Sequence, residues 1–371
     1  MENKRQNYLD GLKAIACIGV FLTHFYGAFM NPQLSGTVMY LGSDLLKVLL
    51  DGDFQIGIFC VISGYLAAKS AIKTPAALVK KSLGRYLRFS LPIFFICLVI
   101  FLIEKMLGFY NGEAGRTLGN SWFAGYYSTP HTVLDLFTSP FFKLWFMADD
   151  SFSGPFWMLC YMLLGSLLTY LGSFLMEKFP KIRLVIFLAL TVLAFFIHYV
   201  TFACLLGAGI GWFIREVKNG KGLNYLFAAL AMLILWLVHS GHMQLLPKIS
   251  PEAYLSGKFV LDGYFKAFYA ALLLICLMGT KWIKLFLGLK PMAWLGRLSF
   301  GVYAFHWPVI CSFAAVLFTA LYGTMDYTAM YGILFAVSVL MTFGISWLFA
   351  KYVEPVCSVT IGAVLKERLK K

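Results

Sequence analysis

Long apolar segments constrain this chain more than any other feature of its sequence. A helix needs about 20 apolar residues to cross roughly 30 Å of hydrocarbon. Ten candidate segments are present, at residues 11–30, 54–70, 88–104, 154–176, 184–198, 200–214, 223–240, 263–279, 294–320 and 329–350. The composition agrees, because 60% of the 371 residues are apolar and only 13% are charged, whereas a soluble domain is usually about half apolar and a quarter charged. We therefore predict an all-α fold, a polytopic membrane helix bundle in the lipid bilayer.

The stretch between Arg183 and Arg215 decides the number of spans. Its 31 residues contain no Lys, Arg, Asp or Glu, and one helix of that length would be about 46 Å long. If two helices cross there and the N-terminus is cytoplasmic, 24 Lys and Arg lie on the inner side and 7 on the outer side. If only one helix crosses, the inner side has 15 Lys and Arg and the outer side has 16. Membrane proteins keep Lys and Arg on the cytoplasmic side. We predict a break near residues 198–201, ten transmembrane helices and both termini in the cytoplasm.

The charge balance excludes some classes of partner and site. The formal net charge is +14, and the predicted topology gives the inner side an excess of 18 positive charges and the outer side an excess of 4 negative ones. The basic excess thus follows the membrane topology, and no soluble basic module is evident for nucleic acid. The eight cysteines form no CxxC pair and fall in predicted spans or the cytoplasmic tail, so we expect neither disulfides nor a metal site.

The domain organisation is expected to be simple. We interpret residues 1–371 as a single transmembrane domain without a separate soluble domain, and the first apolar segment as a retained anchor and not a signal peptide. The longest connection, about 105–153, is predicted to be external and is rich in aromatic residues. Loops of this length are often functional, so it either binds sugar rings or forms an interfacial belt or partly buried cap. The oligomeric state stays open, a homo-oligomer included.

Ionisable residues within the first predicted span are candidates for function, because such groups are costly in a membrane. Lys13 and His24 are eleven residues apart, so a helix places them on one face and separates them by roughly 16 Å along its axis. Asp10, one turn before Lys13, is its expected partner. His24 either carries out chemistry or donates to a backbone carbonyl as an ordinary core histidine.

The ninth predicted span holds a second histidine, His306, at a depth close to that of His24. Tyr303 is three residues earlier and shares its face. Pro308 lacks an N–H group and clashes with the carbonyl of Ala304, so we expect a kink and a free acceptor beside His306. Together these features predict a polar cavity between helices.

Two further patterns concern packing and charge. Ser63-Gly64 and the Gly207/Gly211 pair have the small residues that let membrane helices pack closely. Arg85 and Arg88, three residues apart in the most basic connection, can converge on one anion, because guanidinium groups match phosphate oxygens in pairs. The alternative is that both arginines follow the positive-inside rule or contact anionic lipid.

In combination, these motifs resemble the acyltransferase-3 family of membrane acyltransferases. The resemblance rests on the Lys13-x10-His24 spacing, Arg85-x-x-Arg88, the segment 58–65 ending Ser63-Gly64-Tyr65, the segment 295–308 containing Tyr303 and His306, and Glu354-Pro355. It runs from residue 8 to about 356. The chain departs from the family at Gly57 and at residues 158–162 after Trp157, where many members have carboxylates.

The resemblance implies an O-acyltransferase of the cell (inner) membrane. Such proteins move an acyl group, most often acetyl, from cytoplasmic acyl-CoA to a hydroxyl of a cell-envelope or exopolysaccharide sugar, with acetyl-CoA as co-substrate and no permanently bound cofactor. It further implies His24 as general base, Asp10 as partner of Lys13 in catalysis, and Lys13 as an orienting or coenzyme A-binding charge. Arg85 and Arg88 would bind coenzyme A. The substrate tunnel would include Ser63, Trp157, Tyr303, His306 and Glu354, and Tyr303 and His306 would line the tunnel or hold the thioester oxygen.

Two alternatives remain open at this point. Ser63 is a candidate covalent acyl carrier, although no base is placed beside it by the sequence, and direct transfer is preferred. The chief alternative function is a transporter or flippase that moves a lipid-linked sugar or polysaccharide without acyl transfer, because buried histidines also suit proton relays.

Overall fold

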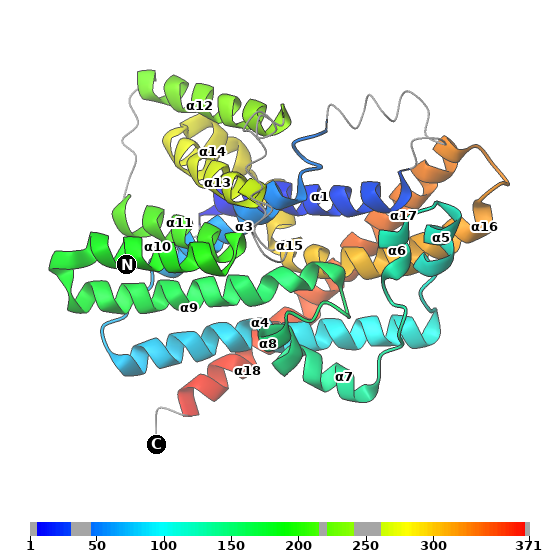
Figure 1. The fold of residues 1–371 in the computed structure, drawn as a ribbon, viewed down its shortest axis with the longest axis horizontal. Helices are drawn as coiled ribbons and strands as arrows, with labels where there is room; N and C mark the ends of the chain where they lie inside the picture. The colour runs from blue at the N-terminus through cyan, green and yellow to red at the C-terminus, as the bar shows by residue number, and fades with distance from the viewer. Residues whose placement is uncertain (1–5, 31–45, 215–220, 241–260, 368–371) are drawn as a thin grey trace, which may run out of the picture. The chain divides into compact units, whose positions relative to one another are not determined.

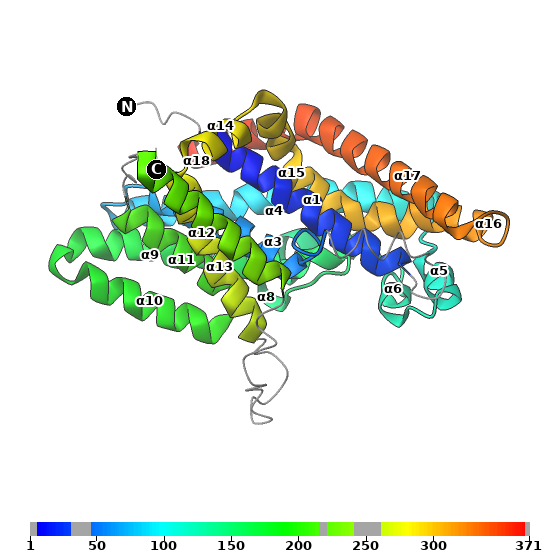
Figure 2. The ribbon, with the colours of Figure 1, turned by 90° about the horizontal axis from the view of Figure 1, so that it is seen from above.

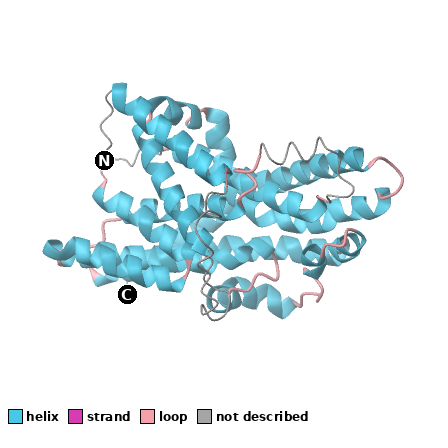
Figure 3. Ribbon diagram, turned by 45° about the horizontal axis from the view of Figure 1, so that its top comes forward, coloured by secondary structure: helices cyan, strands magenta, loops and turns pink. Residues whose placement is uncertain are grey.

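The computed structural model describes residues 6–30, 46–214, 221–240 and 261–367, and these residues form helices and no strand (Figure 1; Figure 3). The predicted all-α fold is confirmed. Eight helical segments in these ranges are long and apolar enough to span a membrane: Asn7–Phe29, Pro75–Met106, Gly154–Lys178, Pro180–Ile197, Gly222–His239, Leu261–Gly279, Lys290–Leu321 and Tyr327–Lys366. Two shorter apolar helices are Gly52–Ala68 and Tyr199–Phe213. Each predicted span corresponds to one of these segments, while the count of ten crossings and the cytoplasmic termini stay predictions.

The long helices are α1 (Asn7–Phe29), α3 (Gly52–Ala68), α4 (Pro75–Met106), α9 (Trp157–Lys178), α10 (Arg183–Ile197), α11 (Tyr199–Phe213), α12 (Lys221–His239), α13 (Leu261–Gly279), α15 (Lys290–Val309), α17 (Tyr327–Leu348) and α18 (Glu354–Glu367). The short ones are α5 (Asn111–Thr117), α6 (Ser121–Gly125), α7 (Val133–Thr138), α8 (Leu144–Met147), α14 (Lys281–Leu287) and α16 (Ala315–Leu321). Single 3-10 or π turns are η1 (Ser139–Lys143), η2 (Gly154–Phe156), η3 (Pro180–Ile182), η5 (Ile310–Ala314) and η6 (Phe349–Val353).

The predicted break in the long uncharged stretch is confirmed. Helix α10 ends at Ile197 and α11 begins at Tyr199, with the backbone of His198 extended between them at φ −173° and ψ 149°. The His198 side chain accepts a hydrogen bond from the N–H of Val200 at 3.3 Å. This contact satisfies one of the N–H groups that the first turn of a helix leaves unpaired.

The chain divides into two compact units. Unit 1 comprises the described residues of 1–16, 51–85 and 161–296, and unit 2 those of 17–50, 86–160 and 297–371. Each unit thus draws on segments far apart in the sequence. That the whole chain acts as one domain stays a prediction.

Close packing of α3 against α11 organises unit 1 (Figure 2). A Cβ atom added to Gly64 would lie 1.8 Å from the carbonyl oxygen of Cys204, and one added to Gly207 would lie 1.9 Å from that of Val61. Real Cβ atoms do not approach an oxygen so closely, so the two backbones can meet only at glycine. The predicted packing role of both glycines is confirmed.

Aromatic side chains form the core of unit 2. Phe21, Phe25 and Phe29 of α1 are buried together with Trp307 of α15 and Phe318 of α16. The residues between 105 and 153 join this core through short helices. Thus the segment predicted as a long connection is mostly helical and partly buried.

The amide of Asn111 fixes this segment locally. Its nitrogen donates to the carbonyl oxygens of Phe123 and Tyr126, at 2.8 and 2.7 Å. The Phe123 ring is fully buried, whereas the neighbouring Trp122 is 44% exposed. Part of the aromatic content is therefore core, and part is available at the surface.

Candidate functional site

Two imidazole rings meet inside unit 2. The ring centroids of His24, on α1, and His306, on α15, lie 4.9 Å apart with their planes at 61°. His306 is fully buried, while His24 is partly exposed. The structure thus brings together two histidines that are 282 residues apart in the sequence and were predicted to lie at similar depth.

The hydrogen bonds of both rings define their tautomers. Nδ1 of His24 lies 2.8 Å from the carbonyl oxygen of Val20, and Nδ1 of His306 lies 3.0 Å from that of Val302. A carbonyl oxygen only accepts, so Nδ1 must carry the proton in each ring. In the neutral imidazole, Nε2 is then the basic nitrogen. His24 donates to a backbone carbonyl of its own helix, as the core-histidine alternative predicts, and its role in chemistry stays a prediction.

Aromatic rings surround the pair. We call His24, His306, Trp122, Tyr126 and Trp307 the imidazole cluster. Trp307 lies 5.4 Å from His24, and Trp122 lies 6.1 Å from it, between ring centroids. Trp122 and Tyr126 each lie 4.9 Å from Trp307. The described neighbours of the histidines are mostly aromatic, because the 105–153 segment packs its rings against them, and the expected polar cavity stays a prediction.

The acceptor predicted beside Pro308 is not free, which corrects that prediction. The hydroxyl of Ser153 donates to the carbonyl oxygen of Ala304 at 3.1 Å. Pro308 cannot donate to this oxygen because it lacks an N–H group, and the serine takes that place. A π turn, Ile310–Ala314, follows the proline.

The remaining predicted tunnel residues are scattered over several elements. The Tyr303 hydroxyl donates to the carbonyl oxygen of Pro155 and is buried. Trp157 begins α9 and is half-buried, and Glu354 begins α18, also half-buried. Tyr303 lies 6.3 Å from His306 between ring centroids, so it is the one of these three with a described contact to the imidazole cluster.

In unit 1, Arg85 is held by two serines. Its Nη2 donates to the Oγ of Ser63 at 2.5 Å, and its Nε donates to the Oγ of Ser166 at 3.2 Å. We call these three residues the guanidinium cluster. Ser166 was missed by the sequence analysis, since a lone serine in an apolar helix carries no distinctive signal. Arg88, in unit 2, is exposed.

Lys13 and Asp10 form the expected ion pair. Nζ of Lys13 lies 2.7 Å from a carboxylate oxygen of Asp10, with the two side chains 25% and 7% exposed. The pair lies within a single helix turn of α1. Its role in catalysis or donor binding stays a prediction.

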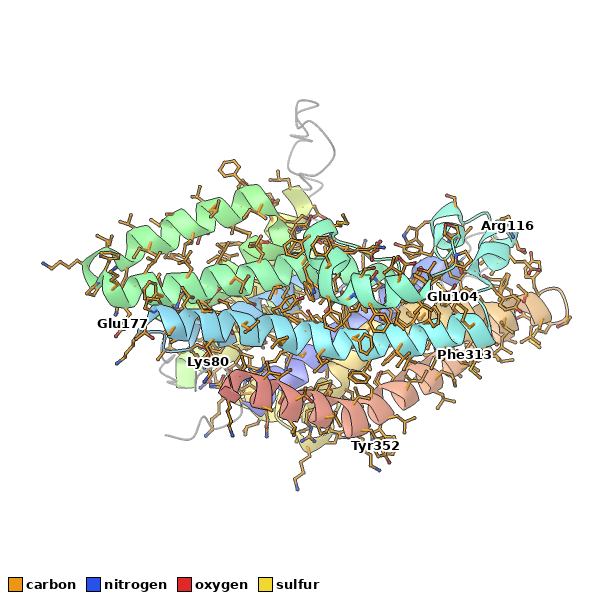
Figure 4. The ribbon with its side chains drawn as sticks, turned by 90° about the horizontal axis from the view of Figure 1, so that it is seen from below. Lys80, Glu104, Arg116, Glu177, Phe313 and Tyr352 are labelled. Atoms are coloured by element: carbon orange, nitrogen blue, oxygen red, sulfur yellow. The ribbon has the colours of Figure 1, made fainter. Side chains whose placement is uncertain are left out.

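A cavity of about 270 Å³ lies at the C-terminal ends of α3, α9 and α11 in unit 1. Its lining includes two basic side chains, Lys69 and Arg183, one acidic side chain, Glu177 (labelled in Figure 4), and the indole of Trp212. The Trp212 N–H donates to the hydroxyl of Ser173 at 3.0 Å. The sequence analysis counted these cations only as part of a basic inner surface.

Charged side chains also gather at the opposite ends of these helices in unit 1. Lys266 lies 2.6 Å from a carboxylate oxygen of Asp262 and 3.0 Å from one of Asp51. Nearby, Tyr199 donates to Asp53 at 2.7 Å. Burial lowers the pKa of His198 from 6.5 to about 4, although the charge of Asp53 partly opposes this. In the other unit, Glu104 of α4, labelled in Figure 4, binds Nδ1 of His131 at 2.6 Å.

Metal-binding groups were searched within the described ranges, and no set of three His, Cys, Asp or Glu side chains there could hold an ion. The side chains described above carry imidazole, indole, guanidinium and hydroxyl groups.

Comparison with known proteins adds one finding. The sequence model of a protein family described as an acyltransferase domain (Acyl_transf_3) matches residues 6–351. The comparisons with curated proteins and with solved structures found no match. The matched range includes both histidines, the guanidinium cluster and the Lys13–Asp10 pair.

Proposed function

The chain belongs to the acyltransferase family that matches it, and from this premise we propose that it transfers an acyl group, acetyl in the first place, from acyl-CoA to a hydroxyl of a cell-envelope sugar. It is an integral multi-pass membrane protein with acyltransferase activity. The observation that carries the finer proposal is the imidazole pair, in which each Nδ1 is committed to a carbonyl oxygen and each Nε2 is basic. The cell membrane is its proposed location, because acyl-CoA is cytoplasmic.

His24 is the proposed general base. Its ring is partly exposed, whereas His306 is fully buried, so a substrate hydroxyl can reach His24 more easily. Nε2 of His24 accepts the hydroxyl proton as the acceptor oxygen attacks the thioester carbon. A neutral imidazole accepts protons near pH 7, and a base of this kind typically contributes 10²–10⁴-fold in rate. His306 positions the His24 ring by contact.

The guanidinium cluster is the proposed donor-binding element. Arg85 is oriented by Ser63 and Ser166, and an oriented guanidinium binds phosphate oxygens well. Coenzyme A separates its phosphates from its thioester by a long flexible arm, so phosphate binding and catalysis can be carried by residues that are not neighbours. Arg88 and the Lys13–Asp10 pair are assigned to the same electrostatic task.

The cavity in unit 1 extends this donor-binding region. Lys69 follows Ser63 by six residues on α3, and Ser173 follows Ser166 by seven on α9. At 1.5 Å per residue, the cavity lies about 10 Å along both helices from the level of Arg85. A multiply anionic, extended donor suits two cationic positions spaced in this way. Lys69 and Arg183 are therefore proposed to bind a second phosphate of the donor.

The contact between Arg85 and Ser63 supports direct transfer over a covalent serine intermediate. A serine becomes a nucleophile when an adjacent base removes its proton. The group that lies beside Ser63 is a guanidinium, which stays protonated in proteins and therefore cannot act as a base. We therefore assign Ser63 to positioning Arg85.

The acceptor is proposed to meet the partly exposed Trp122. Its ring lies 6.1 Å from that of His24, and an indole face packs against the apolar face of a sugar ring. This arrangement would hold a sugar hydroxyl next to the base, and orientation of this kind contributes strongly to catalysis. In this proposal the acceptor binds to the 105–153 segment, which agrees with the sequence interpretation that this segment binds sugar rings.

The test uses membranes that contain the full-length protein and acetyl-CoA labelled in its acetyl group. Membranes with the wild-type protein are expected to transfer label to the glycan fraction, and membranes with H24A at equal protein abundance are expected not to. The matched control is H198N, which replaces a histidine outside the imidazole cluster and should label as the wild type does.

Two outcomes would contradict the proposal. Equal labelling by wild type and H24A would remove His24 as the base. Export of a lipid-linked sugar that depends on the protein, without any transfer of label, would favour the transporter alternative. Mass spectrometry of the labelled glycan would identify the acyl group and the acylated position together.

A further inference from the structure

Two buried polar atoms in the imidazole cluster lack hydrogen-bond partners. Among the described residues, Nε2 of His306 and Nε1 of Trp307 are buried and make no hydrogen bond, and both side chains are 0% exposed. Leaving a buried polar group unsatisfied is energetically costly, so native proteins rarely do it without reason. Both atoms belong to rings that contact His24, at 4.9 and 5.4 Å between centroids.

These two atoms differ in what they can offer to a substrate. With Nδ1 protonated, Nε2 of His306 carries a lone pair and only accepts. The indole nitrogen of Trp307 carries a hydrogen and only donates. The indole is therefore the group that can stabilise negative charge, and the imidazoles are the groups that can take a proton.

Four other donors near His24 are already engaged. The Tyr303 hydroxyl donates to the carbonyl oxygen of Pro155, and the Ser153 hydroxyl donates to that of Ala304. The Nδ1–H groups of His24 and His306 donate to Val20 and Val302. Only the Trp307 donor, of those named, is without an acceptor among the described residues.

Gly154 packs closely against this donor. A Cβ atom added to Gly154 would lie 3.1 Å from Nε1 of Trp307 and 2.8 Å from Cε1 of Tyr126. Any larger residue would press on the indole N–H edge. The neighbour of the unsatisfied donor is thus the smallest one available.

We propose that the indole N–H of Trp307 donates a hydrogen bond to the carbonyl oxygen of the acyl group during transfer, which makes Trp307 a catalytic residue. This inference rests on the proposed function. The acceptor oxygen bonds to the acyl carbon while Nε2 of His24 takes its proton, and the carbonyl electron pair moves onto the oxygen that Trp307 stabilises. The C–S bond then breaks, the carbonyl re-forms, and the leaving thiolate takes the proton from the imidazolium. Donors placed in advance at such an oxygen supply a large share of catalysis.

The kinetic test compares W307F with W145F in membranes that contain the full-length protein and the cell-envelope glycans, with acetyl-CoA as the donor and release of the coenzyme A thiol as the readout. Phe keeps an aromatic ring at 307 but removes the donor. Loss of one oxyanion donor typically lowers kcat by on the order of 10²–10³-fold, and we expect W307F to fall near the lower value with the KM for acetyl-CoA within about three-fold. W145F is the matched control, because the Trp145 N–H already donates to the carbonyl oxygen of Pro140. Its kcat should stay within about three-fold of wild type.

A donor-restoring variant separates hydrogen bonding from packing. W307H carries a ring N–H, so it should recover part of the kcat lost in W307F. Folded W307F with kcat within about three-fold of wild type would overturn the inference. W307H that folds but is no faster than W307F would do the same.

A spectroscopic measurement keeps the inference testable if W307F does not accumulate. The indole proton resonance of Trp307, assigned by its loss in W307H, should move downfield with acetyl-CoA and stay in place with free coenzyme A, which lacks the acyl oxygen. Equal shifts with both ligands would overturn the inference. If membranes with the wild-type protein neither release thiol from acetyl-CoA nor transfer label to the glycan fraction, the proposed function itself fails. If H24A is inactive while W307F is not, only the inference about Trp307 fails.

Discussion

The imidazole cluster of unit 2 and the guanidinium cluster of unit 1 differ in how their polar atoms are satisfied. In unit 1, Arg85 donates to the hydroxyls of Ser63 and Ser166. In unit 2, Nε2 of His306 and Nε1 of Trp307 are buried and have no hydrogen-bond partner among the described residues. An oriented cation is ready to bind an anion, whereas an unsatisfied base and donor are ready for a reacting group. This difference is the basis of the proposed roles, which are donor binding for the guanidinium cluster and acyl transfer for the imidazole cluster.

The largest expected effect comes from replacing His24. In H24A the acceptor hydroxyl loses its general base, so kcat should fall by about 10²–10⁴-fold. The kcat of H306A should fall less, because His306 acts through His24. The double variant should be no worse than H24A, since residues that act as one unit have non-additive effects. Steady-state release of the coenzyme A thiol from acetyl-CoA measures the kcat of all three variants. A larger loss of kcat in H306A than in H24A would indicate that His306 is the general base.

Replacing Arg85 should weaken the binding of acetyl-CoA and leave the chemical step almost unchanged. Hydrogen bonds to charged groups contribute about 1.5–3 kcal/mol, which corresponds to roughly a ten- to hundred-fold rise in the KM for acetyl-CoA in R85A. R85K keeps the charge but loses the planar fork and should lie between R85A and wild type. The kcat of both variants should stay within about three-fold. A fall in kcat at unchanged KM would break the proposed division between the two clusters.

Substitutions of the cavity residues should change the KM for acetyl-CoA less than substitutions of Arg85 do. The basic and the acidic residues of the cavity should change it in opposite directions. Partly exposed charge pairs contribute about 0.2–1 kcal/mol, so K69Q and R183Q should each raise the KM for acetyl-CoA by less than about five-fold. E177Q removes a negative charge from the same cavity and should lower KM slightly. KM values at low and high salt provide the check, because screening should reduce all three differences. An unchanged KM in K69Q and R183Q would restrict donor binding to Arg85 and its neighbours.

The smallest effect concerns stability and not catalysis. Above pH 6.5, His198 is neutral in both the folded and the unfolded chain. Below it the unfolded chain binds a proton that the folded protein takes up only near pH 4, since burial lowers the pKa of His198 to about 4. The free energy of unfolding should therefore fall as the pH drops from 6.5 to 4. H198N keeps a helix-capping acceptor that does not titrate, so its Tm should fall less over this range, and an equal fall would contradict the assignment.

The sequence was a good guide wherever the relevant interaction is local. The helices follow from apolar runs, and the break at His198 followed from charge counting before any coordinates. The Asp10–Lys13 pair was predictable because the two side chains are one helix turn apart. The close packing at Gly64 and Gly207 was likewise foreseen from residue size alone.

Contacts between helices were harder to foresee. The sequence indicated that Pro308 would leave an acceptor free, yet Ser153, 151 positions from Ala304, donates to it. The cavity near Lys69 and the serine partners of Arg85 were equally invisible, because each depends on which faces of separate helices meet. Helical periodicity predicts which residues share one face of a helix, but it does not predict which other helix that face contacts.

By itself, the sequence determined that this protein is a helical membrane protein of the acyltransferase kind, with histidines and arginines as its candidate functional groups. Only the tertiary structure decided that His24 and His306 touch, and that the indole of Trp307 beside them has no acceptor. The physical reason is that apolar content and helix geometry are properties of consecutive residues. Hydrogen-bond satisfaction is a property of neighbours in space, and it is settled when the helices pack.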